Sequence, residues 1–282
     1  MNLKTVFRNG RKTTAVLGAV AGVAAVSLAA TAGATERTAR HDAPAKKPTV
    51  VLVHGAFADA SSWNGVIKRL ERDGYPVVAP ANPLRGLAGD AAYVRSVLDS
   101  VEGPVVLAGH SYGGAVISQA AAGDPDVKAL VYIAAFTPEV GESALELSGK
   151  FPGSTLGGTL ASVPFPLAGG GTGTDLYIKA DKFHDQFAAD VPESVTDLMA
   201  ATQRPVAASA LEEKATEAAW KTIPSWNLIA TEDYNIPPAA QRFMAERAHA
   251  HTAEVKASHA VSVSRPGAVA RLIERAAQAA VR

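Results

Sequence analysis

The chain has 282 residues, of which 27 are basic (Lys or Arg) and 27 are acidic, so its formal net charge is zero. This balance excludes a nucleic-acid-binding protein that works through bulk positive charge. The chain contains no cysteine, which excludes disulfides, thiolate metal sites and cysteine nucleophiles. Hydrophobic residues make up 48% and charged residues 19%, a composition typical of a globular protein. At this length the chain can form one large α/β domain or two small domains.

The first 34 residues have the order of regions found in a secretory signal peptide. Basic residues without any acid occupy positions 1–12, an uncharged apolar run begins at Thr13, and Ala32-Gly33-Ala34 is a small-x-small cleavage pattern. An uncleaved membrane anchor is the alternative, but a run so rich in Ala and Gly and so poor in Leu would span a membrane weakly. Because Arg11-Lys12 is not an arginine pair, the Sec route is favoured over the twin-arginine route. We therefore expect a secreted protein, cleaved near Ala34, with no stable membrane span afterwards.

Residues 35–48 are polar and carry two prolines, so we expect them to form an unstructured linker. Cleavage after Ala34 would remove four basic residues and no acidic one, leaving 248 residues with a net charge of −4. The folded domain is expected to span residues 49–282.

Beyond the linker, short apolar runs alternate with amphipathic stretches. The run Thr49–Val53 is continuous and rich in valine, as a buried parallel strand would be. Such alternation predicts an α/β fold with a mostly parallel sheet of about six strands and helices on both faces. The other expected strands are Tyr75–Ala79, Pro104–Ala108, Ala129–Ala134, Ser225–Ala230 and Ala253–Val255. The expected helices are Ser62–Asp73, Asp90–Val101, a helix ending near Ala122, Pro238–Ala250 and Pro266–Val281.

The alternation stops between residues 137 and 221, which hold prolines, glycines and polar helical pieces but no strong strand. A stretch of this length is too long for an ordinary loop. We therefore expect a helical cap inserted into the α/β domain.

The segment Gly109-His110-Ser111-Tyr112-Gly113 contains the pattern G-x-S-x-G. The pattern alone is weak, because two glycines and a serine recur by chance. Here an apolar strand lies directly before it and an Ala-rich helix directly after it, which is the strand–turn–helix context of a nucleophile elbow. Ser111 would then stand at the carboxyl edge of the sheet, over a helix N-terminus that favours negative charge. The alternative is a glycine-rich turn in an ordinary α/β protein.

A serine nucleophile requires a base, and a tetrahedral oxyanion requires N–H donors. His259 is the best candidate base, because it lies in a late loop between the final strand and the last helix. The backbone N–H groups of Ala56 and Tyr112 are the candidate oxyanion-hole donors. We expect His54, two residues before Ala56, to anchor this loop by hydrogen bonding.

The remaining histidines are weaker candidates for the base. His41 lies in the linker, and His110 would point away from the serine hydroxyl. His184 lies in the cap, where we expect it at the surface. His249 and His251 form an H-x-H pair without an apparent third ligand, so no metal site is predicted.

The imidazole also needs an acid to orient it. The adjacent carboxylates Glu232 and Asp233 follow the strand that ends at Ala230. Asp233 is the better candidate from its position in the strand-end loop. The order Ser111, Asp233, His259 is one of the known chain orders of a serine triad.

Four ordered motifs give the chain a clear resemblance to the α/β-hydrolase superfamily. They are Val53–Phe57, the Gly109–Gly114 elbow, Ala230–Pro237 and Ser258–Ala260, and they occur within residues 49–281. Their combination is specific for fold and triad and much less specific for substrate. Within the superfamily the chain resembles the compact branch of small-molecule esterases, plant methyl-ester hydrolases and hydroxynitrile lyases. The resemblance implies an α/β-hydrolase fold and a triad that needs no cofactor.

Three features narrow this resemblance. Little chain precedes Thr49 for the two leading strands of larger members, which favours about six strands. The lyases of the branch carry a lysine directly after the triad histidine; this chain has Ala260 there, which counts against lyase chemistry. Epoxide hydrolases and dehalogenases need a carboxylate nucleophile; this chain has Ser111 there, which counts against both of these activities.

The sequence therefore predicts a secreted serine hydrolase that cleaves small apolar or aromatic carboxylic esters through an acyl-enzyme. Phe57 would wall the pocket, with Trp63 in the core, and the cap would add apolar residues. These cap residues are Leu145, Leu147, Phe151, Phe165, Leu167, Tyr177 and Phe183, of which Phe165 and Tyr177 are the chosen pocket candidates.

Several alternatives stay open at this point. A cofactor-free perhydrolase or haloperoxidase, a lactonase and an amidase would use the same triad. From another class, a non-catalytic binding module would have the same fold. The sequence specifies neither the acyl and alcohol groups of the substrate nor whether the protein is a monomer or a dimer.

Overall fold

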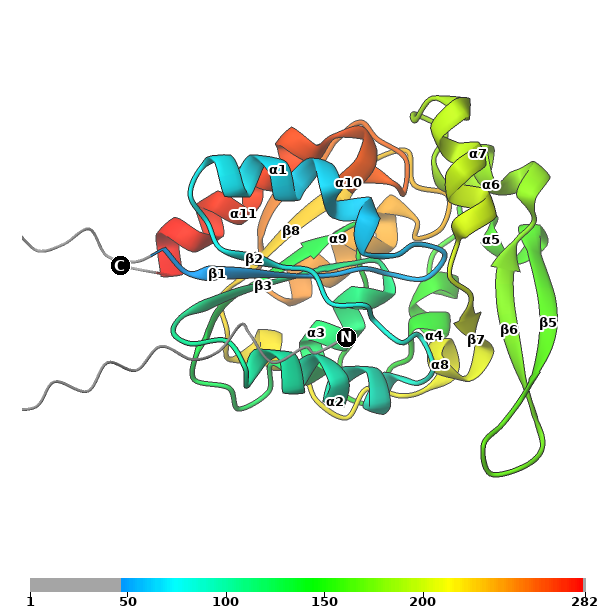
Figure 1. Cartoon of the computed structure of the whole chain (residues 1–282), viewed down its shortest axis with the longest axis horizontal. Helices are drawn as coiled ribbons and strands as arrows, with labels where there is room; N and C mark the ends of the chain where they lie inside the picture. The colour runs from blue at the N-terminus through cyan, green and yellow to red at the C-terminus, as the bar shows by residue number, and fades with distance from the viewer. Residues whose placement is uncertain (1–46, 281–282) are drawn as a thin grey trace, which may run out of the picture. The chain divides into compact units, whose positions relative to one another are not determined.

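The computed structural model describes residues 47–280, so the predicted signal peptide and most of the predicted linker lie outside it. At its centre is a six-stranded parallel sheet with the strand order β2-β1-β3-β4-β8-β9 (Figure 1). This confirms the predicted α/β-hydrolase sheet. The strands are β1 (Thr49–Val53), β2 (Val77–Val78), β3 (Val105–His110), β4 (Val127–Ile133), β8 (Ser225–Ala230) and β9 (His251–Val255).

Helices cover both faces of this sheet (Figure 1). Every residue of β3 is buried, which explains why the central strands have unbroken apolar sequences. One face of the sheet is covered by α1 (Asn64–Arg72) and α11 (Pro266–Ala280), and the other by α2 (Leu87–Leu98), α3 (Tyr112–Ala120) and α9 (Pro238–Arg247). Trp63 is fully buried, as predicted.

No helix within residues 47–280 has the length and apolar character needed to cross a membrane.

The cap is inserted between β4 and β8, but the expectation that it lacks strands is wrong. Three strands, β5 (Leu160–Pro166), β6 (Thr172–Ile178) and β7 (Val206–Ala207), form an antiparallel sheet with β6 in the middle. The cap helices are α4 (Ala144–Gly149), α5 (Leu156–Thr159), α6 (Ala180–Phe187), α7 (Glu193–Thr202), α8 (Ala208–Glu212) and η2 (Ala219–Lys221). Two further short helices outside the cap are η1 (Ala60–Trp63) and α10 (Val261–Ser264).

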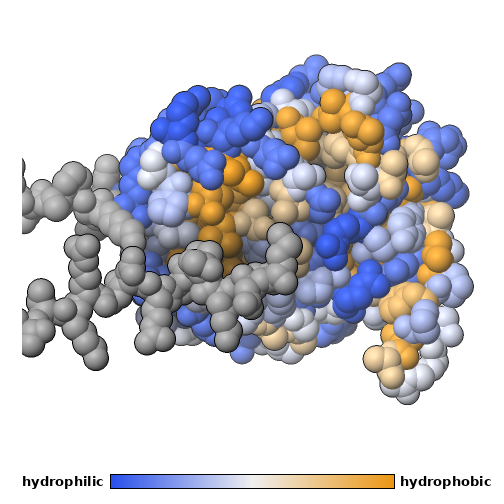
Figure 2. All heavy atoms as spheres, in the orientation of Figure 1, coloured by the Kyte–Doolittle hydropathy of each residue, from blue (hydrophilic) through white to orange (hydrophobic). Residues whose placement is uncertain are grey.

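The hairpin β5–β6 is hidden in the sequence because Pro164 and Pro166 interrupt the apolar alternation of β5. Proline is tolerated on an edge strand, which has one side without a hydrogen-bonding partner, and β5 is an edge of the small sheet. The hairpin projects from the cap (Figure 1), and apolar residues lie on its surface (Figure 2), including the exposed Val163 and Leu167.

Helix α3 packs so closely on the segment after β4 that only glycine fits at position 114. A Cβ there would lie 2.8 Å from the Cβ of Ala135, and the carbonyl oxygen of Phe136 would be closer still. Because protein interiors are close-packed, a side chain at this point would force α3 away from the sheet. The position of the β3–α3 turn thus depends on Gly114.

Two buried histidines connect loops at the carboxyl edge of the sheet. His54 Nδ1–H donates to the Gly55 carbonyl (2.9 Å), and His54 Nε2 accepts from the Asn82 N–H (3.0 Å), so this residue anchors its loop as expected. His110 Nε2–H donates to the His259 carbonyl (2.8 Å). Burial lowers the pKa of both rings, and for His110 the neighbouring His259 lowers the pKa further.

Replacing Gly114 by alanine should lower the free energy of unfolding by roughly 1–3 kcal/mol, because the new methyl group overlaps backbone and side-chain atoms. Gly89→Ala is the matched control: Gly89 is exposed in α2 with open space around it, and alanine there should stabilise the helix by about 0.5–1 kcal/mol. Urea unfolding of both variants measures these changes, and equal stability of the two would contradict the packing argument.

The low histidine pKa values predict a loss of stability on acidification. Unfolded histidines, with a pKa near 6.5, take up a proton as the pH falls, whereas burial lowers the pKa of His54 and lowers that of His110 much further, so that His110 resists protonation in the folded protein. The unfolded state then binds more protons and is favoured. Between pH 7.5 and pH 5.5, His110 should lower the free energy of unfolding by about 1.4 kcal/mol, and His54 acts in the same direction.

Urea titrations at the two pH values test this. His110→Asn should reduce the pH-dependent loss by about the amount given for His110, whereas His249→Asn, at an exposed position, should leave the loss unchanged. An equal loss in the wild type and in His110→Asn would contradict this, because it would show that His110 takes up a proton in the folded state as readily as in the unfolded state.

Candidate active site

Ser111 occupies the turn between β3 and α3 in a strained backbone conformation. Its φ of 53° lies in the left-handed region, which is unfavourable for a residue with a side chain. Its N–H donates to the Ile133 carbonyl (3.3 Å), and its own carbonyl accepts from the N–H groups of Gly114 (3.0 Å) and Phe136 (3.1 Å). These bonds hold the strained turn at the carboxyl edge of the sheet.

The loop after β1 approaches Ser111 so closely that position 55 must be glycine. A Cβ there would lie 2.6 Å from the Ser111 Cβ and 2.8 Å from the His110 carbonyl oxygen. Consequently Ala56, Tyr112 and Ser111 line one cavity. The Tyr112 N–H is the first of α3, where no carbonyl of the helix can accept from it. Within residues 47–280, neither this N–H nor that of Ala56 donates to a backbone carbonyl.

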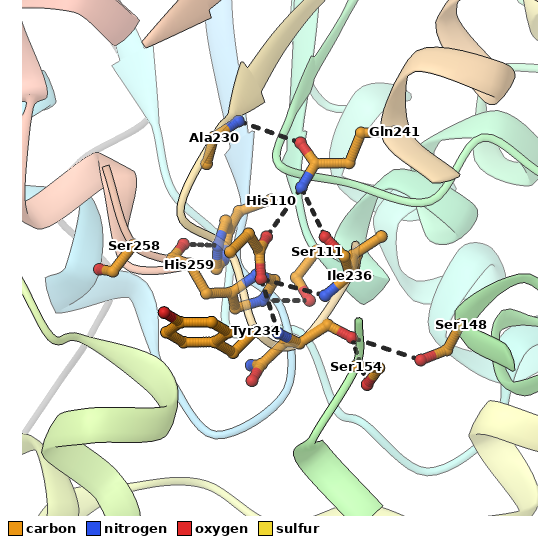
Figure 3. Close-up of polar contacts among 12 residues, drawn as sticks. His110, Ser111, Ser148, Ser154, Ala230, Tyr234, Ile236, Gln241, Ser258 and His259 are labelled. Atoms are coloured by element: carbon orange, nitrogen blue, oxygen red, sulfur yellow. Dashed lines mark hydrogen bonds and ion pairs between the residues drawn. The ribbon is translucent and has the colours of Figure 1, made fainter. Parts of the chain in front are cut away.

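The structure brings the three predicted triad residues together, and Figure 3 shows Ser111 beside His259. His259 Nε2 lies 2.8 Å from Ser111 Oγ, and His259 Nδ1 lies 2.6 Å from Asp233 Oδ2. These residues are 148 and 26 positions apart in the chain, and all three are buried. The imidazole therefore joins a hydroxyl on one side to a carboxylate on the other.

Asp233 accepts four hydrogen bonds. Oδ1 accepts from the backbone N–H groups of Asn235 (2.7 Å) and Ile236 (3.0 Å), and Oδ2 accepts from Gln241 Nε2 (2.9 Å) and His259 Nδ1 (2.6 Å). An ionised carboxylate has acceptor sites for all of these donors and none of its own to offer. The surroundings are thus built for the charged form of Asp233.

Gln241 is a site residue that the sequence analysis missed. Besides holding Asp233, its amide donates to the Ile236 carbonyl (2.8 Å) and accepts from the Ala230 N–H (3.1 Å). It is fully buried on α9, which begins directly after the Asp233 loop. Its place on the helix after the Asp233 loop can be read from the sequence, but its burial and its contact with Asp233 cannot.

A buried acid, Asp90, is a second residue the sequence analysis missed. The Tyr112 hydroxyl donates to Asp90 Oδ2 (2.9 Å), and the Arg85 N–H donates to Oδ1 (3.1 Å). Burial raises the pKa of the Asp90 carboxyl and of the Tyr112 hydroxyl. The pair ties the residue that follows Ser111 to helix α2.

The cap holds the loop that carries Asp233 through several hydrogen bonds, of which Figure 3 shows those made by Ser148 and Ser154. Gln186 Nε2, from α6, donates to the Tyr234 carbonyl (2.9 Å) and to Asn235 Oδ1 (2.8 Å). The Ser154 hydroxyl donates to the Asn235 carbonyl (2.9 Å). The position of the acid loop therefore depends on the cap as well as on α9.

Ser111 opens into a cavity of about 120 Å³ with a mostly apolar lining. Phe57 lines it, as expected, but Phe165 and Tyr177 do not, so their prediction as pocket residues is wrong. Leu176 reaches the cavity, and because strand residues alternate in direction, Tyr177 beside it faces away. Phe165 packs at the far end of the hairpin, opposite Gly173.

The other cap residues predicted to be apolar pocket residues lie partly in the cavity lining, partly in the core and partly at the surface. Leu145 lines the cavity, Leu147 and Phe183 are buried in the core, Phe151 packs against that core, and Leu167 is exposed.

His41 lies outside the described residues. His184, His249 and His251 lie away from the proposed triad. His184 is half-buried in the cap, with Nδ1 3.1 Å from Thr196 Oγ1, and does not line the cavity. His249 and His251 are exposed. In residues 47–280, no three His, Asp or Glu side chains gather in a way that would hold a metal ion.

Comparisons with known proteins agree with this architecture. An alpha/beta hydrolase from Aspergillus novofumigatus, nvfD, is 28% identical over 256 residues, covering 83% of this chain and 98% of the relative. A pyrethroid hydrolase from Sphingobium wenxiniae is 29% identical over 253 residues, covering 79% of this chain and 85% of the relative.

The fold is shared with a solved structure of polyneuridine aldehyde esterase, with a TM-score of 0.71 at 19% identity, covering 81% of this chain and 98% of that one. The sequence profile of the alpha/beta hydrolase family matches residues 50–272. This chain therefore belongs to the alpha/beta hydrolase family.

Proposed function

We propose that this protein is a serine esterase that cleaves small carboxylic esters through an acyl-enzyme on Ser111. The observation that carries the proposal is the continuous hydrogen-bonded line from Ser111 Oγ through His259 to Asp233, with distances of 2.8 Å and 2.6 Å. A serine hydroxyl, a histidine base and a carboxylate held by hydrogen bonds from the protein, in this order, form the catalytic triad of serine hydrolases. Relatives named as esterases and as a pyrethroid hydrolase support the same reaction class.

In the acylation half, Ser111 Oγ attacks the ester carbonyl carbon while His259 Nε2 accepts the hydroxyl proton. The N–H groups of Ala56 and Tyr112 stabilise the oxyanion of the tetrahedral intermediate. Asp233 holds Nδ1–H and stabilises the imidazolium without taking its proton. The intermediate collapses when the C–O bond breaks and His259 returns the proton to the leaving alcohol.

In the deacylation half, water takes the place of the alcohol. His259 Nε2 accepts a proton from this water as its oxygen attacks the acyl carbon. The second intermediate releases the carboxylic acid, and His259 protonates Ser111 Oγ. The protein thereby returns to its starting protonation state.

The cavity at Ser111 indicates the size of the group that binds. Its volume of about 120 Å³ is close to that of an apolar cavity that accepts one benzene molecule, about 150 Å³. Its walls include Phe136, Leu156, Leu160 and Leu176. This lining favours a short acyl chain or a single aromatic ring over a polar polymer.

We also propose that the enzyme is secreted, from the order of charged, apolar and small residues in positions 1–34. N-terminal sequencing of protein collected from the culture medium should then read from Thr35. Protein found only in the cell fraction, with Met1 or Asn2 at its N-terminus, would contradict export.

Ser111→Ala should lower kcat for p-nitrophenyl acetate by about 10,000-fold or more, because the nucleophile is lost. Ser96→Ala, a matched change on the exposed face of α2, should leave kcat unchanged. Undiminished turnover by folded Ser111→Ala would exclude the mechanism. Circular dichroism establishes the folding of each variant.

Asp233→Asn forms a second arm of this experiment. In either orientation of the asparagine amide, its NH₂ group faces other donors. These are the N–H groups of Asn235 and Ile236 in one orientation and those of Gln241 and His259 in the other. The imidazole then loses its orienting acceptor, and kcat should fall by roughly 1,000- to 10,000-fold.

A further inference from the structure

A second cavity, of about 230 Å³, lies between η1 and α7 and takes no part in the mechanism proposed above. Phe57 is the one residue in the lining of both this cavity and the Ser111 cavity. Phe57 therefore stands at the boundary between a small space that contains the serine and a larger space behind it.

Phe57 is held firmly at this boundary. Its N–H donates to the Arg204 carbonyl in the cap (3.0 Å), and its φ of 61° lies in the left-handed region. Its ring packs edge-on against Phe187 with 6.4 Å between centroids, and Phe187 packs edge-on against the His259 ring at 5.1 Å. With only 3% of its surface exposed, Phe57 is a fixed wall connected to the triad by aromatic contacts.

The second cavity has a lining that combines apolar and polar side chains, as ligand-binding cavities do. Val195, Met199 and Val263 form an apolar part of its lining, and Asp59 and Gln203 add polar groups. The cavity is about twice the volume of the space at Ser111.

We propose that Phe57 determines the substrate size of this enzyme: its side chain confines the bound acyl group to the cavity at Ser111 and closes off the second cavity. Removal of the side chain joins the two cavities, so that esters of medium-length acyl chains enter the second one. This inference rests on the proposed esterase function.

The test compares kcat/KM for p-nitrophenyl octanoate with that for p-nitrophenyl acetate. Phe57→Ala should raise the octanoate-to-acetate ratio at least tenfold over the wild type. Each additional buried methylene contributes a factor of about four, so the entry of two methylenes already exceeds tenfold. The ratio is the readout because a change beside Ala56 alters the rates for both esters. Phe57→Leu, a smaller removal, should give a smaller gain and serves if Phe57→Ala does not fold.

Met199→Trp places a larger side chain in the lining of the second cavity and provides the control. Alone it should leave the ratio at the wild-type value, because Phe57 already closes this cavity. Combined with Phe57→Ala it should return the ratio to the wild-type value. An unchanged ratio in both folded Phe57 variants, or a gain that survives Met199→Trp, would overturn the inference. Failure of the proposed esterase function would give a different result from failure of this inference: Ser111→Ala would then hydrolyse both esters at the wild-type rate.

Discussion

The buried negative charge of Asp233 is the constraint on which the rest of the site depends. A charge removed from water is costly unless donors surround it, and this carboxylate receives four hydrogen bonds. The donors come from its own loop, from Gln241 on α9 and from His259 in the loop before α10. Satisfying one carboxylate thus fixes the Asp233 loop and the α9 helix that follows it relative to the distant loop that carries His259. The imidazole is oriented towards Ser111 as a result of that arrangement.

The cap contributes to the same arrangement while shaping the cavity. Gln186 binds the backbone that follows Asp233, and one residue further along α6 Phe187 packs against the rings of His259 and Phe57. The Phe187 carbonyl also accepts from the Ala260 N–H (2.9 Å). Helix α6 therefore contacts His259 and the Asp233 loop of the proposed triad as well as Phe57, so substitutions in this helix should affect substrate size and triad geometry together.

The sequence was sufficient for the features that depend on local pattern. The short apolar runs predicted the bounds of β1 and β8 to the residue, because both strands are buried on both faces. The edge strand β2 covers only Val77–Val78 of the predicted Tyr75–Ala79, since a half-exposed strand has a weaker pattern. Motif context and chain order selected the three residues that meet at Ser111. The sequence did not predict Gln241 and Gln186 as site residues, because a single amide side chain on a helix produces no periodic pattern. Tyr177 was misassigned because its direction depends on the register of a hairpin that the prolines conceal.

The central claim is that Ser111 is the nucleophile, and stoichiometric phosphorylation tests it most directly. Diethyl p-nitrophenyl phosphate transfers its phosphoryl group to an activated serine and releases p-nitrophenolate, leaving an adduct that hydrolyses slowly. The account predicts one equivalent of p-nitrophenolate per chain, an adduct on the peptide that contains Ser111, and a loss of esterase activity in proportion to that adduct. Full modification of Ser111 with activity retained, or full inactivation with Ser111 unmodified, would contradict it.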